Sequence, residues 1–204
     1  MQKTRLTVVW LGIMLSTGSG LAIADAQQDY AVGLETYESG NAVEAARWFG
    51  MAAEQGLAEA QLQLGSLYYK GQGVAQDFGQ ALYWFIQAAE HGNAEAQTNL
   101  GYIYDKAMAG VAQDYKKAVA WYRKAAEQGY ANAQFDLGMM YYEGLGVLQD
   151  YIEAHKWLNL AASNGHPDAA ASREHTEKRM TNAQIAEAQK RASEWQAAFD
   201  RAHF

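Results

Sequence analysis

Several residues of this chain are of types that carry out chemistry, but their spacing forms no recognisable catalytic motif. The five histidines are scattered, and none lies four residues from another with a glutamate between them, as in a helical zinc site. Neither Ser-x-x-Lys nor Gly-x-Ser-x-Gly occurs, and the chain has no cysteine. The sequence therefore offers no candidate catalytic residue, metal ligand or cofactor site. The five histidines are His91, His155, His166, His175 and His203.

Carboxylates and glycine-rich loops also fail to define a site. Most of the 23 acidic residues fall on helix faces that we predict to be exposed, and no pair suited to glycoside hydrolysis can be identified. GQGV at residues 71–74 and GLGV at residues 144–147 lie between predicted helices. A phosphate-binding loop requires a preceding strand. We therefore interpret these glycines as turn residues.

The N-terminal residues have the features of a secretory signal peptide. Two basic residues precede an apolar run over residues 6–15, and Ala-Ile-Ala at residues 22–24 then supplies a small-x-small cleavage pattern. The run is shorter than the ~20 residues that span a bilayer. We predict cleavage after Ala24, with Ala26 as the second choice, and a periplasmic or secreted protein. No cysteine follows the run, so neither lipid attachment nor stable membrane insertion is expected.

The charge balance bears on the class of partner. Loss of residues 1–24 would remove Lys3 and Arg5 but no acidic residue, which leaves 14 basic and 23 acidic residues and a formal charge of −9. An acidic surface without a basic stripe repels phosphate backbones, so nucleic acid is not an expected partner. Without cysteine the fold has no disulfide framework, and packing alone must hold it together in an oxidising compartment.

A repeated pattern accounts for much of the remaining sequence. Four tryptophans are spaced by 36, 37 and 36 residues, and each is followed by Ala-Ala at +4 and +5 and by glycine at +8. A fixed period of this length is typical of stacked-repeat proteins. The tryptophans are Trp48, Trp84, Trp121 and Trp157, and the glycines are Gly56, Gly92, Gly129 and Gly165.

Each repeat predicts two helices. Before three of the tryptophans, Asp77, Asp114 and Asp150 are placed to cap a helix N-terminus, and the glycine at +8 suits the C-terminus. Gln80 and Glu153 are expected to complete capping boxes. The other half of each repeat carries Leu-Gly-x-x-Tyr at helical spacing.

Glycine in mid-helix costs about 1 kcal/mol relative to alanine. We therefore expect the glycine to admit a bulky aromatic side chain of the second helix. The recurring tryptophans and Tyr68, Tyr104 and Tyr141 are interpreted as core residues rather than as a sugar-stacking platform.

These residues resemble the Sel-one-like repeat family, a relative of the tetratricopeptide repeats. The resemblance rests on A-x-x-x-L-G-x-x-Y-x-x-G-x-G-V-x-x-D-x-x-x-A-x-x-W-x-x-x-A-A-x-x-G and covers three units over residues 57–165. It implies an all-α fold, a right-handed superhelical solenoid of stacked helical hairpins. Residues 27–56 lack the G-x-G-V-x-x-D insertion and are closer to a tetratricopeptide repeat. KAMAGV, which begins at Lys106, has one extra residue and Ala107 in place of glycine, so a slightly altered turn is expected.

Residues 166–204 depart from the repeat and are expected to form capping helices. Thr181 and Gln184 form a predicted capping box before an apolar stripe. Terminal caps cover the face that the last repeat would otherwise leave exposed. The stripe consists of Ile185, Ala188, Ala192, Trp195 and Phe199.

The resemblance implies that the first helix of each repeat lines a concave surface that binds a protein or peptide. Relative to the Leu-Gly glycine, positions −3, +1 and +4 lie about 140–200° around the helix from the core leucine. In the last full repeat this face is aromatic and methionine-rich, which suits either peptide binding or packing against neighbouring helices. The predicted partner-binding residues are Tyr30, Leu34, Tyr37, Leu62, Ser66, Tyr69, Thr98, Tyr102, Asp105, Phe135, Met139 and Tyr142.

Two functional hypotheses follow. The first is an exported, non-enzymatic scaffold or adaptor in envelope regulation or assembly. The alternative is a cell-wall, glycan or β-lactam-related binder or hydrolase, like some cysteine-rich members of the resembling family. Those members carry a disulfide in each repeat, and this chain has no cysteine. The first hypothesis is therefore preferred.

Overall fold

The computed structural model describes residues 18–203 and contains ten helices and no strand within that range. Side chains are described from residue 25. Most of the expected signal peptide therefore lies outside the described residues, and the expected cleavage sites fall inside the first helix. The helices are α1 (Gly18–Glu38), α2 (Ala42–Glu54), α3 (Ala58–Lys70), α4 (Phe78–Glu90), α5 (Ala94–Lys106), α6 (Tyr115–Glu127), α7 (Ala131–Glu143), α8 (Tyr151–Ser163), α9 (Ala169–Glu177) and α10 (Asn182–His203).

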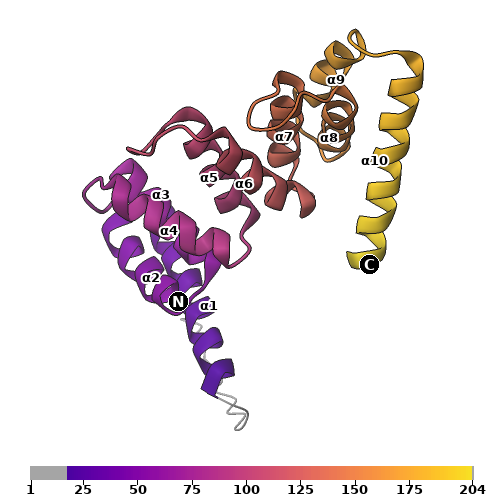
Figure 1. The fold of residues 1–204 in the computed structure, drawn as a ribbon. Coiled ribbons are helices and arrows are strands. Elements are labelled where there is room, and N and C mark those ends of the chain that lie inside the picture. The colour runs from indigo at the N-terminus through magenta and orange to yellow at the C-terminus, as the bar shows by residue number, and fades with distance from the viewer. Residues whose placement is uncertain (1–17, 204) are drawn as a thin grey trace, which may run out of the picture.

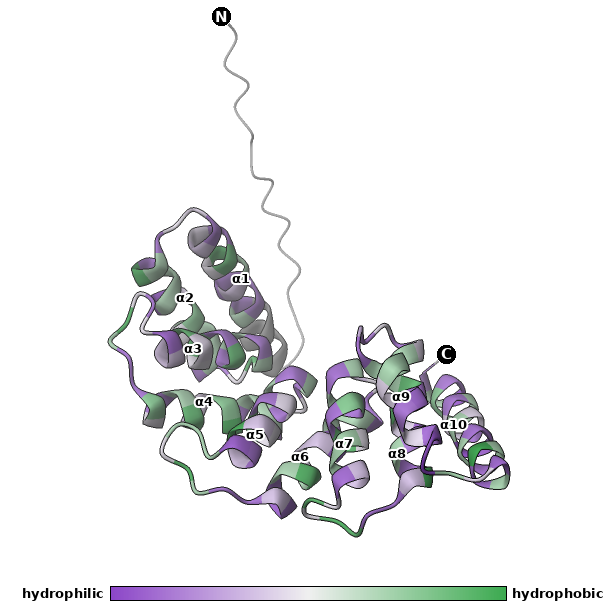
Figure 2. Ribbon diagram, turned by 90° about the horizontal axis from the view of Figure 1, so that it is seen from above, coloured by the Kyte–Doolittle hydropathy of each residue, from purple (hydrophilic) through white to green (hydrophobic). Residues whose placement is uncertain are grey.

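The first eight helices form four hairpins that stack in chain order. Each of α1, α3, α5 and α7 packs against the helix that follows it, and each of α2, α4 and α6 also packs against the first helix of the next hairpin. We call the first helix of each hairpin helix A and the second helix B. The hairpins follow one another along a curved path (Figures 1 and 2). The predicted all-α solenoid of stacked hairpins is confirmed.

The hydrophobic core is shared between neighbouring hairpins. One cluster joins Phe49 of α2 to Leu64 of α3, and the next joins Phe85 of α4 to Leu100 of α5. A single hairpin could not bury these residues alone, because the partner side chains belong to the neighbouring repeat. Figure 2 shows hydrophobic residues recurring in every helix of the stack.

The glycine of helix A determines how closely helix B approaches. A Cβ atom built on Gly65 would lie 2.9 Å from the Phe85 ring, and one on Gly101 would lie 2.5 Å from the Tyr122 ring. The same position holds Gly33 against Phe49 and Gly138 against Leu158. The expected close approach is confirmed, and the side chain responsible is the residue that follows each tryptophan.

The tryptophans themselves lie at the junctions between repeats. Trp157 is buried, as predicted, whereas Trp48, Trp84 and Trp121 are half-buried. Trp84 of α4 packs against the α2–α3 cluster, and Trp121 of α6 packs against the α4–α5 cluster. Each of these two rings therefore covers the core that its own hairpin shares with the preceding one.

Helix ends follow the predicted caps with one exception. The Asp77 and Asp114 carboxylates accept hydrogen bonds from the backbone N–H groups of Gln80 and Lys117, both at 3.0 Å, and Asp150 caps α8 in the same way. The glycines at +8 have φ between 83° and 91°, in the left-handed region. The prediction that Gln80 and Glu153 complete capping boxes is wrong.

A capping box requires the backbone N–H of the cap residue to donate to the side chain three residues later, but here that N–H donates to helix A. The backbone N–H groups of Asp77 and Asp150 donate to the carbonyls of Tyr68 and Tyr141 in helix A. Glu153 is thereby left to form ion pairs elsewhere.

A buried glutamine in helices α3, α5 and α7 joins successive hairpins, a role that the sequence analysis did not assign. Each glutamine donates its side-chain amide to an alanine carbonyl near the end of the preceding helix B. Its side-chain oxygen in turn meets the residue that caps the next helix B. The linked sets are Gln61 with Ala53 and His91, Gln97 with Ala89 and Gln128, and Gln134 with Ala126 and Asn164, at 2.8–3.2 Å.

The insertion loops provide a second contact between repeats. Gly73 lies directly against the backbone of Ala42 at the start of α2, and Gly146 lies in the same way against Tyr115 at the start of α6. A side chain at either glycine would collide with that backbone. In the altered turn Ala107 ends α5 with φ 54°, so alanine occupies the left-handed conformation that Gly71 and Gly144 adopt elsewhere.

Helices α9 and α10 both pack on α8 and close the C-terminal end of the stack (Figure 1). The Trp195 ring lies 5.7 Å from that of Trp157, and Ala188 and Ala192 are buried, as expected for a capping stripe. The predicted capping box is also present, because Gln184 Oε1 accepts from the backbone N–H of Thr181 at 2.8 Å.

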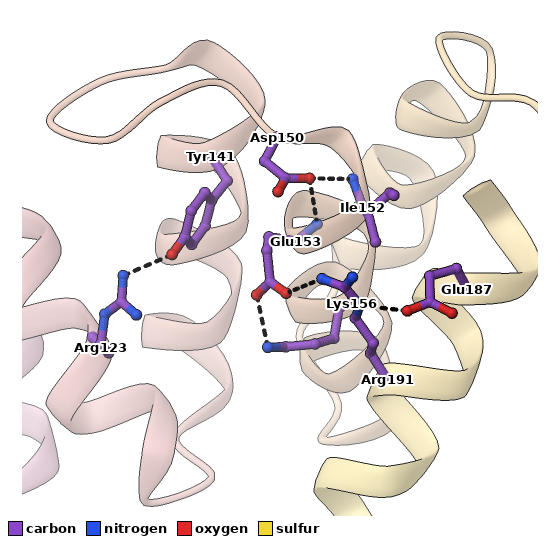
Figure 3. Close-up of polar contacts among 8 residues, drawn as sticks. All are labelled: Arg123, Tyr141, Asp150, Ile152, Glu153, Lys156, Glu187 and Arg191. Carbon is purple, nitrogen blue, oxygen red and sulfur yellow. Dashed lines mark hydrogen bonds and ion pairs between the residues drawn. The ribbon is translucent and has the colours of Figure 1, made fainter.

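One ion pair joins α10 to α8, and neighbouring ion pairs within each helix extend it. Glu153 accepts hydrogen bonds from Lys156 at 2.7 Å and from Arg191 of α10 at 3.0 Å (Figure 3). Arg191 also pairs with Glu187 at 2.8 Å. Although burial opposes it, hydrogen bonding to the two cations keeps the pKa of Glu153 below its usual value.

Gly101→Ala should lower the free energy of unfolding by about 1–3 kcal/mol, because the added methyl group collides with the Tyr122 ring. Gly50→Ala is the matched control, since a Cβ on Gly50, inside α2, would meet nothing within 4 Å. The free energy of unfolding of the control should rise by about 1 kcal/mol, because alanine has a higher helix propensity than glycine. Urea unfolding followed by circular dichroism measures both, and a gain in both variants would contradict the close-approach account.

Candidate functional site

The twelve predicted binding residues all lie on A helices, but three of them are buried. Leu62 belongs to the core cluster with Phe85, and Thr98 donates its hydroxyl to the carbonyl of Ala94 at 2.8 Å. Asp105 is 7% exposed and forms an ion pair with Lys106 at 2.8 Å. The structure therefore corrects the predicted surface at these three positions, because helix packing turns them inward.

The other nine residues reach the surface. Tyr37 and Tyr102 are exposed, at 37% and 48%. The remaining seven are half-buried: Tyr30, Leu34, Ser66, Tyr69, Phe135, Met139 and Tyr142. The hydroxyl of Tyr37 donates a hydrogen bond to the side-chain oxygen of Gln72 at 3.0 Å. This bond connects the first hairpin to the loop that follows α3.

Two pockets lie between successive A helices, and a third lies between α7 and α9. The α3–α5 pocket has a volume of about 290 Å³ and is lined by Ser66, Tyr69 and Tyr102. The α5–α7 pocket, of about 230 Å³, contains Asp105, Phe135 and Met139 among its walls. A smaller α7–α9 pocket of about 70 Å³ lies beside Met139 and Tyr142. Seven of the twelve predicted residues therefore line pockets on one face, which we call the A-helix face.

The first two pockets are built from the same repeat positions but differ in chemistry. Three of the shared wall positions gain a polar or charged group in the α5–α7 pocket. Tyr69, Phe85 and Asn99 of the α3–α5 pocket correspond to Asp105, Tyr122 and Asp136 of the α5–α7 pocket. The chain thus replaces two aromatic rings and an amide with two carboxylates and a phenol. The lysine is kept, as Lys70 in one pocket and Lys106 in the other.

The α5–α7 pocket has strongly perturbed ionisation. Burial, together with the nearby carboxylate of Asp105, raises the pKa of Asp136 to about 6, against an opposing effect of Lys106. Burial also raises the pKa of Tyr122 far above its usual value, and the two carboxylates add to this effect. The phenol therefore stays protonated at every physiological pH.

The aromatic and methionine cluster of the last repeat combines surface and packing roles. The Phe135 ring stacks on His166 with 4.0 Å between centroids, and Tyr142 lies against Tyr151 and His175. Residues leading into the C-terminal cap therefore cover part of this cluster. Its uncovered part lines the α5–α7 and α7–α9 pockets.

Sequence reasoning missed Tyr122 and Asp136. The sequence analysis assigns no role to either residue, because one follows a repeat tryptophan in a core-facing helix and the other is one of many acidic residues on predicted helices. A position-by-position comparison of the repeats could have identified Asp136, because the preceding repeat has Asn99 at the same position.

Neither a metal centre nor a membrane span is found in the part of the chain that the structure describes. Over residues 18–203 no three or more of the His, Cys, Asp and Glu side chains gather closely enough to hold a metal ion. Within the same range, no helix combines the length and the apolar character needed to cross a bilayer.

Comparison with known proteins identifies the repeats. The sequence profile of the Sel1 repeat family matches residues 24–57, 58–93, 94–130 and 131–166. The first match includes the hairpin that lacks the insertion and that resembled a tetratricopeptide repeat. No curated protein matches the chain.

Two solved structures support this identification. A Sel1 repeat protein from Oxalobacter formigenes is 35% identical, with a TM-score of 0.65, over 72% of this chain and 60% of its own. A protective antigen of uropathogenic Escherichia coli with an SLR fold is 31% identical, with a TM-score of 0.50, over 90% of this chain and 50% of its own. The chain thus spans about half to three fifths of the length of these relatives.

Proposed function

We propose, because this chain belongs to the Sel1 repeat family, that it is a non-enzymatic scaffold that binds a protein or peptide partner along its A-helix face. Sel1 repeat proteins generally mediate protein–protein interactions. The finer proposal is that the A-helix face is the concave binding groove and that the protein works in envelope regulation or assembly.

The row of pockets is the observation that carries this proposal. An extended or helical segment lying across α3, α5, α7 and α9 would meet three pockets in succession, each between two helices of a rigid stack. Exposed tyrosine, half-buried phenylalanine and methionine are the side chains that protein interfaces favour. The acidic charge of the chain argues against nucleic acid as the partner.

The proposed location is the periplasm or the exterior of the cell. Cleavage after Ala24 would shorten α1 to residues 25–38, close to the 13 residues of each helix from α2 to α8. Ala26 is buried, so cleavage after Ala24 also keeps a residue that the first hairpin packs.

N-terminal sequencing of the protein recovered from a periplasmic extract should therefore begin at Asp25. A sequence that begins at Gln27 would indicate the second cleavage site, after Ala26. Retention of residues 1–24 on the protein in the cytoplasm would contradict export.

Affinity capture tests the binding face. The triple variant Tyr69→Ala, Tyr102→Ala and Phe135→Ala removes one ring from each of three A helices and should lower recovery of the captured partner at least tenfold. Tyr102 is exposed and the other two rings are half-buried, outside the fully buried core, so the helical circular dichroism signal should stay unchanged.

A second triple variant provides the matched control. Val43→Ala, Met51→Ala and Tyr83→Ala removes exposed apolar side chains from the B helices α2 and α4. Capture by this variant should equal that of the unmodified protein. The proposal fails if the A-face variant captures the partner normally or if the B-face variant loses it.

A further inference from the structure

The α5–α7 pocket contains a carboxylate that the protein leaves without a partner. Among the described residues, the Asp136 side chain forms no ion pair and accepts no hydrogen bond, although it lies in a wall of the pocket. Its neighbour Asp105 is already paired with Lys106 at 2.8 Å. Asp136 is half-buried, and an unpaired carboxylate that is partly removed from water favours a ligand of opposite charge.

Tyr122 is a second group in this pocket without a partner. The side chain as a whole is 1% exposed, and its hydroxyl forms no hydrogen bond within residues 25–203. The hydroxyl is not among the fully enclosed polar atoms, so it faces the pocket. Buried tyrosine hydroxyls usually find one. In the α3–α5 pocket the same position is Phe85, which needs none.

The remaining walls suit a long aliphatic chain rather than a bare ion. Phe135, Met139, Met140 and Leu145 line the pocket beside the acidic groups. Lysine and arginine pack an apolar stem against such surfaces while the charged end reaches polar groups. The described residues do not gather the three ligands that a metal ion would need here.

We propose that the α5–α7 pocket receives a lysine or arginine side chain of the bound segment, with Asp136 as its counter-ion. The phenol oxygen of Tyr122 is a second acceptor for the cationic end, while the methionines and Phe135 contact the stem. The α3–α5 pocket, with Asn99 and Phe85 at the same positions, takes an uncharged side chain.

This inference rests on the proposed function, since it names the chemistry of the partner that the A-helix face binds. A basic partner is also consistent with the charge of the chain, which has 23 acidic and 16 basic residues. Complementary charge steers association and fixes the register of the bound segment.

The test uses two small amides that differ in charge, N-acetyl-lysine methylamide and its uncharged analogue N-acetyl-norleucine methylamide. Protein with ¹³C-labelled methionine methyl groups is titrated with each amide and observed by NMR. Met139 and Met140 report on the α5–α7 pocket, and Met108 reports on the α3–α5 pocket of the same molecule.

The lysine amide should shift the Met139 and Met140 signals in a saturable manner and leave Met108 unchanged, whereas the norleucine amide should bind at least tenfold more weakly. Equal binding of the two amides, or no saturable shift with the lysine amide, would overturn the proposal.

Asp136→Asn is the matched variant, because the preceding repeat carries Asn99 at the same position and folds around it. The substitution should weaken binding of the lysine amide at least tenfold with an unchanged circular dichroism spectrum. Unchanged affinity in the folded variant would contradict the role of Asp136 as counter-ion.

The pH dependence follows from the same carboxylate. The cation binds the deprotonated form of Asp136, whose pKa is about 6, so lowering the pH from 7.5 to 5 should weaken binding about tenfold. Asp105, Lys106, Tyr122 and Glu143 also face this pocket. The response is therefore assigned to Asp136 only if it disappears in Asp136→Asn.

The titration separates this inference from the proposed function, because it needs no natural partner. If the amides fail to bind while the A-face triple variant still loses its partner, the face binds protein but without a basic anchor. If the amides bind as expected while capture is unaffected by the triple variant, the pocket is real and the proposed binding face is wrong.

Discussion

The close contact between a glycine of helix A and the side chain after the tryptophan of helix B is the constraint on which the other features depend. It brings the two helices of each hairpin together at Gly33, Gly65, Gly101 and Gly138. A hairpin of this kind still exposes apolar surface on both sides, so it becomes stable only when neighbours cover it. The buried glutamines, the insertion loops and the half-buried tryptophans then join one hairpin to the next. The pockets of the A-helix face are the spaces that this stacking leaves between helices.

The sequence predicted the architecture well because periodic features have local causes. Asp77, Asp114 and Asp150 cap helices wherever they stand, and the glycines adopt the left-handed conformation that their positions require. The two capping boxes were wrong because their formation depended on where the backbone N–H of the cap residue would find its acceptor. That acceptor is a carbonyl of another helix, which local sequence does not reveal.

The candidate site was predicted less completely, for a related reason. Helical geometry placed all twelve residues on A helices, but it did not determine how deeply each would be buried. Leu62, Thr98 and Asp105 are buried, which depends on how the helices pack in three dimensions. The difference between Asn99 and Asp136 became informative only when the two pockets were seen to share the same wall positions. A repeated scaffold keeps its framework residues constant and varies its pocket walls, so specificity is expressed at such differences.

Site-specific photocrosslinking in cells tests the central claim, that the A-helix face is where a partner binds, most directly. A photoreactive phenylalanine analogue replaces either Tyr102 on helix A or Tyr83 on helix B, two tyrosines that are 48% and 51% exposed. The account predicts a discrete crosslinked product from position 102 and none from position 83. Crosslinking from position 83 alone, or equally from both positions, would contradict it.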